Sequence, residues 1–322
     1  MFEQKYEKFL KTVNDYDLIP KEIEKVAIAM SGGKDAQVLA AFLLEYKKRE
    51  RPDLELEIVT VAAPRWKYRP DEFFASDESK KDYINEQMKA INETKEFWEK
   101  KGVPYTYVHT VPGITEDMLM KASKPCVWCF FGLYRALCKY LEDEYKKGKK
   151  ITLATGLTKF DLLYVLESLI IRSGGKTWEY DKVYNPKRYY FNRMQLSWFS
   201  PYPKIKIGIP NTDIYKITPI INLTDNETRE LANKMGLPRI PDPCHKLFGD
   251  KYESDKRHFD RYLAGTTTED INIDHVNSGF FSEYQSLLDT FTRVGVLPPV
   301  EEIDNILYEG LYNESLTSVF KD

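Results

Sequence analysis

The residues best suited to chemistry form one short loop, Ser31-Gly32-Gly33-Lys34-Asp35. An apolar run, Lys25 to Met30, precedes this loop, and a stretch with helical spacing of apolar residues follows it as far as Tyr46. Glycines let the backbone turn tightly and bring N–H groups to a phosphate, and the start of a helix carries partial positive charge. Lys34 adds a full charge, and Asp35 is a ligand that Mg²⁺ accepts beside phosphate oxygens. The loop therefore predicts a nucleotide site.

Two familiar phosphate loops do not describe this sequence. The Gly-x-x-x-x-Gly-Lys-Ser/Thr spacing of a Walker loop is absent, and so is the Gly-x-Gly-x-x-Gly spacing of a dinucleotide fold. A strand-to-helix turn that binds nothing would also use glycines. The serine, lysine and aspartate in the same five residues favour the nucleotide interpretation.

The cysteines form a second group with chemical potential. Cys126 and Cys129 open a predicted helix, and Cys244 follows a Pro-Asp-Pro loop. A Cys-x-x-Cys pair puts two thiolates on one side of a turn, as metals and iron–sulfur clusters require, although a redox pair or a zinc half-site has the same spacing. We expect Cys126, Cys129 and Cys244 to meet in space. Cys138, within an apolar helix, is interpreted as a core residue.

The elements that must position these residues alternate between strands and helices. Apolar runs predict strands at 25–30, 56–62, 105–109, 150–154 and 217–223, and helical spacing predicts helices at 2–14, 35–46, 80–102, 127–145, 161–172 and 225–235. This alternation predicts an open, mainly parallel five-stranded sheet with helices on both faces. Such sheets bind ligands at the carboxyl ends of their strands, where Thr155 and Gly156 close the fourth strand. Asp161 either orients substrate or metal, or caps the helix that follows.

The remaining segments set the domain organisation. Residues 173–216 interrupt the alternation and are predicted to form an irregular flap or a hairpin over the sheet edge. We expect residues 1–262 to form the main domain and residues 263–322 a helical C-terminal extension.

Composition excludes several classes of protein. Of 322 residues, 42% are hydrophobic and 30% charged, which is ordinary for a globular protein, and the net charge of −3 argues mildly against a large RNA footprint. No segment approaches the roughly 20 apolar residues of a membrane span, and the first residues lack the apolar core of a signal peptide. We therefore expect a cytoplasmic protein without a membrane partner, whose cysteines stay reduced.

The loop resembles the Ser-Gly-Gly-x-Asp-Ser signature of the PP-loop ATP pyrophosphatases, with Ala36 in the final position. These adenine nucleotide alpha-hydrolase-like proteins have the fold called PP-loop or HUP-like. The resemblance implies that ATP is split to AMP and pyrophosphate while AMP is joined transiently to a substrate oxygen. It also implies that Ala62 lies beside the adenine and that Thr155 and Gly156 face the nucleotide.

Over residues 5–262 the order of motifs is similar to that of the TtcA-type tRNA 2-thiocytidine synthetases. The shared order is the phosphate loop, the Cys-x-x-Cys helix, Thr155-Gly156, the Ile217-Thr218-Pro219 segment with its capped helix, and Gly236 to Cys244. The resemblance implies that Cys126, Cys129 and Cys244 hold a [4Fe–4S] cluster whose fourth iron binds the sulfur to be delivered.

These observations lead to one leading hypothesis, an ATP-dependent sulfur transferase. ATP and Mg²⁺ bind the loop, Lys34, Asp35 and Asp161 are the catalytic candidates, and a separate donor supplies sulfur. The substrate carries an amide-like oxygen and is either a tRNA base or a small molecule or peptide. Two alternatives stay open: an amide ligase or lysidine-type synthetase whose cysteines hold structural zinc, and a nucleotide-binding module without turnover. Pairing into a homodimer is also left open.

Overall fold

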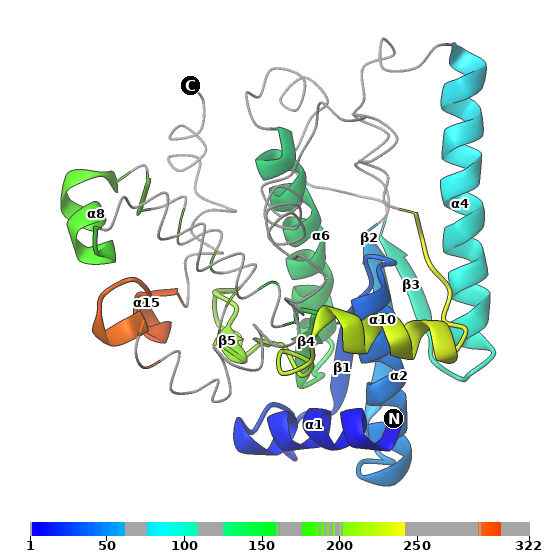
Figure 1. Cartoon of the computed structure of the whole chain (residues 1–322), viewed down its shortest axis with the longest axis horizontal. Helices are drawn as coiled ribbons and strands as arrows, with labels where there is room; N and C mark the ends of the chain where they lie inside the picture. The colour runs from blue at the N-terminus through cyan, green and yellow to red at the C-terminus, as the bar shows by residue number, and fades with distance from the viewer. Residues whose placement is uncertain are drawn as a thin grey trace, which may run out of the picture.

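The computed structural model describes most of the predicted main domain (Figure 1). The described residues are 2–61, 76–108, 125–158, 161, 176–186, 188–189, 192, 196, 200, 202–241, 289 and 291–303, with residues 80 and 125–132 described by their backbone alone. Within these residues, no helix is both long enough and apolar enough to cross a membrane.

Within the described residues, the central element is a six-stranded sheet. Its spatial order is β3-β2-β1-β4-β6-β5. The strands are β1 (Lys25–Ala29), β2 (Glu55–Val61), β3 (Tyr105–Val108), β4 (Ile151–Ala154), β5 (Lys204–Lys206) and β6 (Tyr215–Ile217). The first five in this order are parallel, as predicted, and β5 adds an antiparallel edge strand through a hairpin with β6. The prediction of five strands is therefore corrected to six, because part of segment 173–216 joins the sheet.

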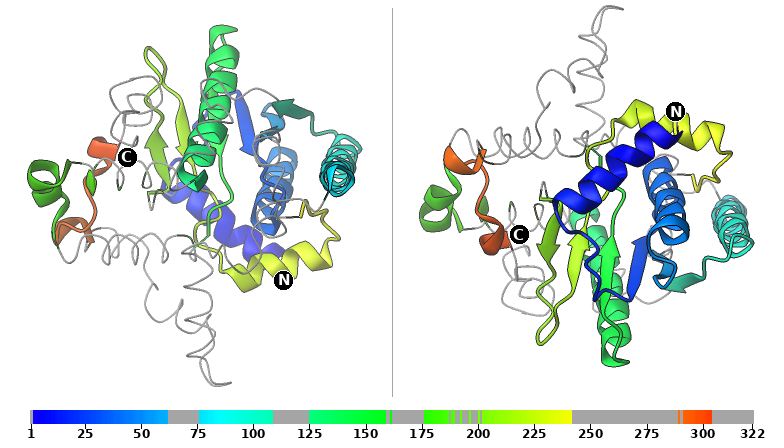
Figure 2. Two further views of the ribbon diagram at one scale, coloured as in Figure 1. Left: turned by 90° about the horizontal axis from the view of Figure 1, so that it is seen from above. Right: turned by 90° about the horizontal axis from the view of Figure 1, so that it is seen from below.

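Helices cover both faces of the sheet, as the alternation predicts (Figure 2). Val26 and Ile28 of β1 pack with α1, α2 and α10, whereas Ala27 between them packs with α6 on the opposite face. The helices are α1 (Phe2–Asp15), α2 (Lys34–Arg49), α4 (Asp77–Glu99), α6 (Pro125–Lys146), α8 (Trp178–Tyr184), α10 (Asp225–Lys234) and α15 (Val300–Ile303).

The fifth predicted strand is shorter than expected. A strand was predicted over 217–223, but β6 ends at Ile217, and the chain then turns, with N–H bonds from Ile221 to the Thr218 carbonyl and from Leu223 to the Ile220 carbonyl. Pro219 has no N–H to donate to a ladder, which favours the end of the strand here. Ile220 and Leu223 are buried in the core from these turns. The apolar run is therefore explained by buried side chains and not by an extended strand.

The helix after this turn begins at its predicted residue and ends at Lys234, one residue before its predicted end. The Thr224 hydroxyl accepts from the Glu227 N–H at 3.2 Å, and the Glu227 carboxylate accepts from the Thr224 N–H at 2.8 Å. This capping box satisfies two backbone donors at the start of α10. Gly236, in the left-handed region with φ +58°, ends the turn after the helix.

The described part of the C-terminal segment packs against the sheet edge. Leu297 and Ile303 share a buried cluster with Leu196, Ile205 and Ile221. The Tyr202 hydroxyl donates to the Pro298 carbonyl at 2.9 Å, and the Trp178 N–H donates to the Gly295 carbonyl at 3.0 Å. The boundary at 262/263 lies outside the described residues, and the division into two domains stays a prediction.

Candidate nucleotide site

The glycine loop connects β1 to α2, as predicted. The Met30 N–H extends the pairing of β1 to β2 by donating to the Val59 carbonyl at 2.9 Å, and Gly33 then begins α2 as its N-cap with extended φ and ψ of −70° and 159°. Gly33 has no side chain with which to cap the helix. The N–H groups of the first turn therefore lack the acceptor that most helices supply at this position, which leaves them suited to an anion.

Gly32 makes a close backbone approach that no other residue could make. Its φ is +88°, and a Cβ added there would lie 2.3 Å from Cβ of Ile240. The Ile240 N–H also donates to the Gly32 carbonyl at 3.1 Å. The segment after α10 therefore closes over the loop. In the sequence, Ile240 is part of the segment from Gly236 to Cys244, and its contact with the loop was not predicted.

The end of β4 touches the start of α2 directly. A Cβ added to Gly156 would lie 2.7 Å from the Ala36 nitrogen and 2.8 Å from the carbonyl carbon of Asp35. Thr155 lies beside the loop but turns toward β6, because its N–H and hydroxyl donate to the Ile217 carbonyl at 2.9 and 3.3 Å. The predicted pair Thr155-Gly156 thus adjoins the loop, with Gly156 as the direct contact.

The charge of Asp161 acts on the other predicted acid, Asp35. Burial raises the pKa of the Asp35 carboxyl, the Lys34 ammonium opposes that shift, and the Asp161 charge raises the pKa further. The buried Asp161 carboxylate accepts from the Thr158 N–H at 2.9 Å and from its hydroxyl at 3.2 Å. The helix that follows lies outside the described residues, so the role of Asp161, as a cap or as a residue that orients substrate or metal, stays a prediction.

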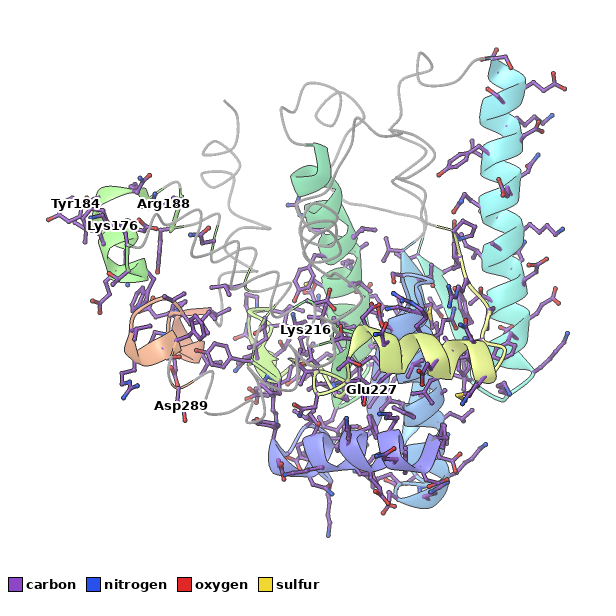
Figure 3. All side chains as sticks on the ribbon, in the orientation of Figure 1. Lys176, Tyr184, Arg188, Lys216, Glu227 and Asp289 are labelled. Carbon is purple, nitrogen blue, oxygen red and sulfur yellow. The ribbon has the colours of Figure 1, made fainter. Side chains whose placement is uncertain are left out.

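Lys34 joins the loop to α10, which crosses α2 in Figure 3 and contacts it. Its ammonium donates to both Asp35 carboxylate oxygens, at 2.8 and 2.9 Å, and also to Oδ1 of Asp225. The Thr228 hydroxyl donates to the same Asp35 carboxylate. Sequence reasoning missed Asp225 and Thr228. A signal existed, because the capping box starts a helix just after β6, whose carboxyl end shares the edge of the sheet with the loop.

Several predicted site residues lie outside what the structure describes. Ala62 and Cys244 are not among the described residues, and Cys126 and Cys129 are placed only by their backbone, in the first two turns of α6. Because α6 runs back to start parallel strand β4, its first turn lies toward the carboxyl ends of the strands, the side that holds the loop (Figure 1). Within the described part of the chain, no three His, Cys, Asp or Glu side chains are placed to hold a metal.

The comparisons with known proteins bear on the fold. No protein-family model matches the chain, and the search of curated proteins gave no match. Among solved structures, the U34-tRNA thiolase NcsA from Methanococcus maripaludis with its [4Fe-4S] cluster matches with a TM-score of 0.54 and 21% identity, over 89% of this chain and 78% of NcsA. A phosphoadenylyl-sulfate reductase from Candida auris, as a phosphate complex, matches at a TM-score of 0.36 and 8% identity, over 79% and 92%. The NcsA likeness shows a shared fold, the PP-loop-like fold expected from the sequence.

Proposed function

We propose that this chain is an ATP-dependent sulfur transferase that forms AMP and pyrophosphate. The observation that carries the proposal is the loop itself: an uncapped helix start and a positive-φ glycine, pressed against Gly156 and flanked by Lys34, Asp35 and Asp161. The fold shared with a tRNA thiolase supports it. No other part of the described chain combines these features.

The chemistry at the loop begins with adenylation. An amide-like oxygen of the substrate attacks the α-phosphorus of ATP, the bond to the β-phosphate oxygen breaks, and pyrophosphate leaves. In this proposal the N–H groups at the start of α2 and the Lys34 ammonium stabilise charge on the phosphates, and the carboxylates of Asp35 and Asp161 would hold Mg²⁺. Hydrosulfide then attacks the activated carbon, and AMP leaves with the original oxygen. No oxidant or reductant is needed for this exchange.

The three cysteines would hold the sulfur-delivering cofactor. A [4Fe–4S] cluster bound by Cys126, Cys129 and Cys244 would supply an open iron at which sulfur can be held. Chain length allows this grouping. Ile240 contacts the loop and precedes Cys244 by four residues, a stretch of chain that spans at most about 14 Å, which is compatible with the proposed grouping. Nothing in the comparisons favours zinc, the alternative from the sequence.

The substrate that we propose is a tRNA base, by analogy with NcsA, in a protein of the cytoplasm. The net charge of −3 keeps a small amide or a peptide as the competing substrate class. Purified protein incubated with ATP, Mg²⁺ and sulfide distinguishes them, because only the true acceptor stimulates pyrophosphate release and gains sulfur. Absence of pyrophosphate release with either class, together with tight ATP binding, would indicate a binding module without turnover.

The cluster has a direct test with a matched control. Anaerobically purified wild type is expected to contain iron and sulfide in a ratio near one and to lose both in Cys244→Ala. Cys138→Ala is the control, because Cys138 is buried in α6 and burial raises the pKa of its thiol, which disfavours the thiolate that metals bind. Cys138→Ala should keep the cluster. Bound zinc in the wild type, or unchanged iron in Cys244→Ala, would contradict the three-cysteine site.

A further inference from the structure

The contact between Lys34 and α10 has a consequence for nucleotide binding. The Lys34 ammonium has three acceptor atoms, two on Asp35 and one on Asp225, and its side chain is 15% exposed. Arg229 engages the other oxygen of Asp225. Lys34 and Arg229 therefore both pair with carboxylates beside the loop.

The first turn of α10 is held firmly in this arrangement. The Glu227 carboxylate, which completes the capping box, also receives the ammonium groups of Lys5 and Lys8 from α1 (Glu227 is labelled in Figure 3). Thr228, one turn into the helix, donates its hydroxyl to Asp35. Asp225 thus faces Lys34 from a helix start that α1 also holds in place through Glu227.

This arrangement conflicts with phosphate binding by Lys34. An ammonium already bonded to two carboxylates has few donors left, since it carries only three N–H groups. For Lys34 to bind a phosphate oxygen, at least one carboxylate must give it up. Asp35 is the proposed Mg²⁺ ligand and would gain the metal as a new partner, whereas Asp225 would keep its bond to Arg229.

We propose that Asp225 is a positioning residue that holds Lys34 away from the phosphates in the ligand-free protein and so sets the affinity for nucleotide. This inference rests on the proposed function of the loop. Binding of the metal nucleotide exchanges the Lys34–Asp225 ion pair for a Lys34–phosphate pair. Breaking the Lys34–Asp225 ion pair costs free energy, and this cost weakens nucleotide binding. Removing the Asp225 charge therefore tightens binding.

Calorimetric titration with MgATP and with Mg-pyrophosphate tests the inference. Asp225→Asn keeps the side-chain shape at the start of α10, and it is expected to lower the Kd for both ligands by about 5-fold, with a lower KM for ATP and little change in kcat. Lys34→Met is expected to raise Kd by about 10-fold, and adding Asp225→Asn to it should change Kd less than 2-fold. Asp225→Ser is the second variant in case the amide disturbs the helix.

Glu230→Gln is the matched control, because it removes the same charge from an exposed position on the same helix. It should leave both Kd values unchanged, whereas Asp225 variants that bind no tighter than wild type would overturn the inference. Equal tightening by Asp225→Asn with and without Lys34 would also overturn it, since the carboxylate would then act on the phosphates directly. Failure of the wild type to bind either ligand would instead overturn the proposed function.

Discussion

Gly156→Ala is expected to reduce MgATP affinity and adenylation about 100-fold, because the added methyl group pushes the end of β4 away from the phosphate loop. The Cβ would lie 2.7 Å from the Ala36 nitrogen, and ordinary contact begins at 3.4 Å, so the backbone must retreat by about 0.7 Å. All three nearest atoms belong to the backbone of Asp35 and Ala36 and cannot rotate away. The displacement therefore falls on the first turn of α2, whose N–H groups we propose as the phosphate ligands.

A second glycine separates this effect from a general loss of stability. Gly148 has φ +86° and no atom within 4 Å of an added Cβ, so Gly148→Ala introduces backbone strain, of roughly 1–2 kcal/mol, away from the site. Overpacking at Gly156 costs a similar roughly 1–3 kcal/mol of unfolding free energy. Denaturation and calorimetry should show both variants destabilised and only Gly156→Ala weakened in nucleotide binding. Equal loss of binding in both would show that Gly156 has no special place in the site.

Local patterns predicted most of the fold and the loop. The run from Lys25 to Tyr46 changes from a continuous apolar strand to helical spacing within a few residues, and the glycines mark the junction. The capping box at Thr224 likewise depends on residues three apart. Such features depend on residues that are close in the sequence, so the spacing of residue types is enough to predict them.

The missed features depend on contacts between distant residues. Lys34 and Asp225 are separated by 191 positions, and their ion pair exists only because α10 packs on α2. The turns after Ile217 are as apolar as a buried strand, so hydrophobicity alone could not distinguish them. β5 has three residues, too few for a periodic signal, and its antiparallel pairing follows from the hairpin with β6.

Lys216→Met is expected to increase the free energy of unfolding by several kcal/mol at pH 6, with a gain that shrinks toward pH 10. Lys216, labelled in Figure 3, lies in β6 between β4 and β5 and has no exposed surface. Burial lowers its pKa from 10.5 to about 7. A pKa difference of this size means that the charged lysine destabilises the folded state by roughly 5 kcal/mol. Lys216→Met also removes the bonds that the ammonium makes, which reduces the expected gain by roughly 1–2 kcal/mol.

The pH dependence follows from the protons that each state binds. Below pH 7 the lysine is protonated in the folded and unfolded chains alike, and the folded protein bears the whole cost of a buried charge. Between pH 7 and about 10.5 Lys216 binds more protons in the unfolded chain than in the folded one. Titration of this lysine therefore raises the unfolding free energy of the wild type with pH, toward that of the methionine variant. Urea denaturation at pH 6, 8 and 10 measures the narrowing difference.

A lysine on the surface provides the comparison for this effect. The Lys89 side chain in α4 is 78% exposed, and Lys89→Met should change the unfolding free energy by less than about 0.5 kcal/mol, with no trend below pH 10. A stability gain in Lys216→Met that stayed constant from pH 6 to pH 10 would mean that better packing, and not the removal of a buried charge, stabilises the variant. A loss of stability at pH 6 would mean that the bonds made by the ammonium outweigh its desolvation. The change of the stability difference with pH therefore separates the cost of burying the Lys216 charge from the effects of packing and of the ammonium's bonds. One measurement at neutral pH would give only their sum.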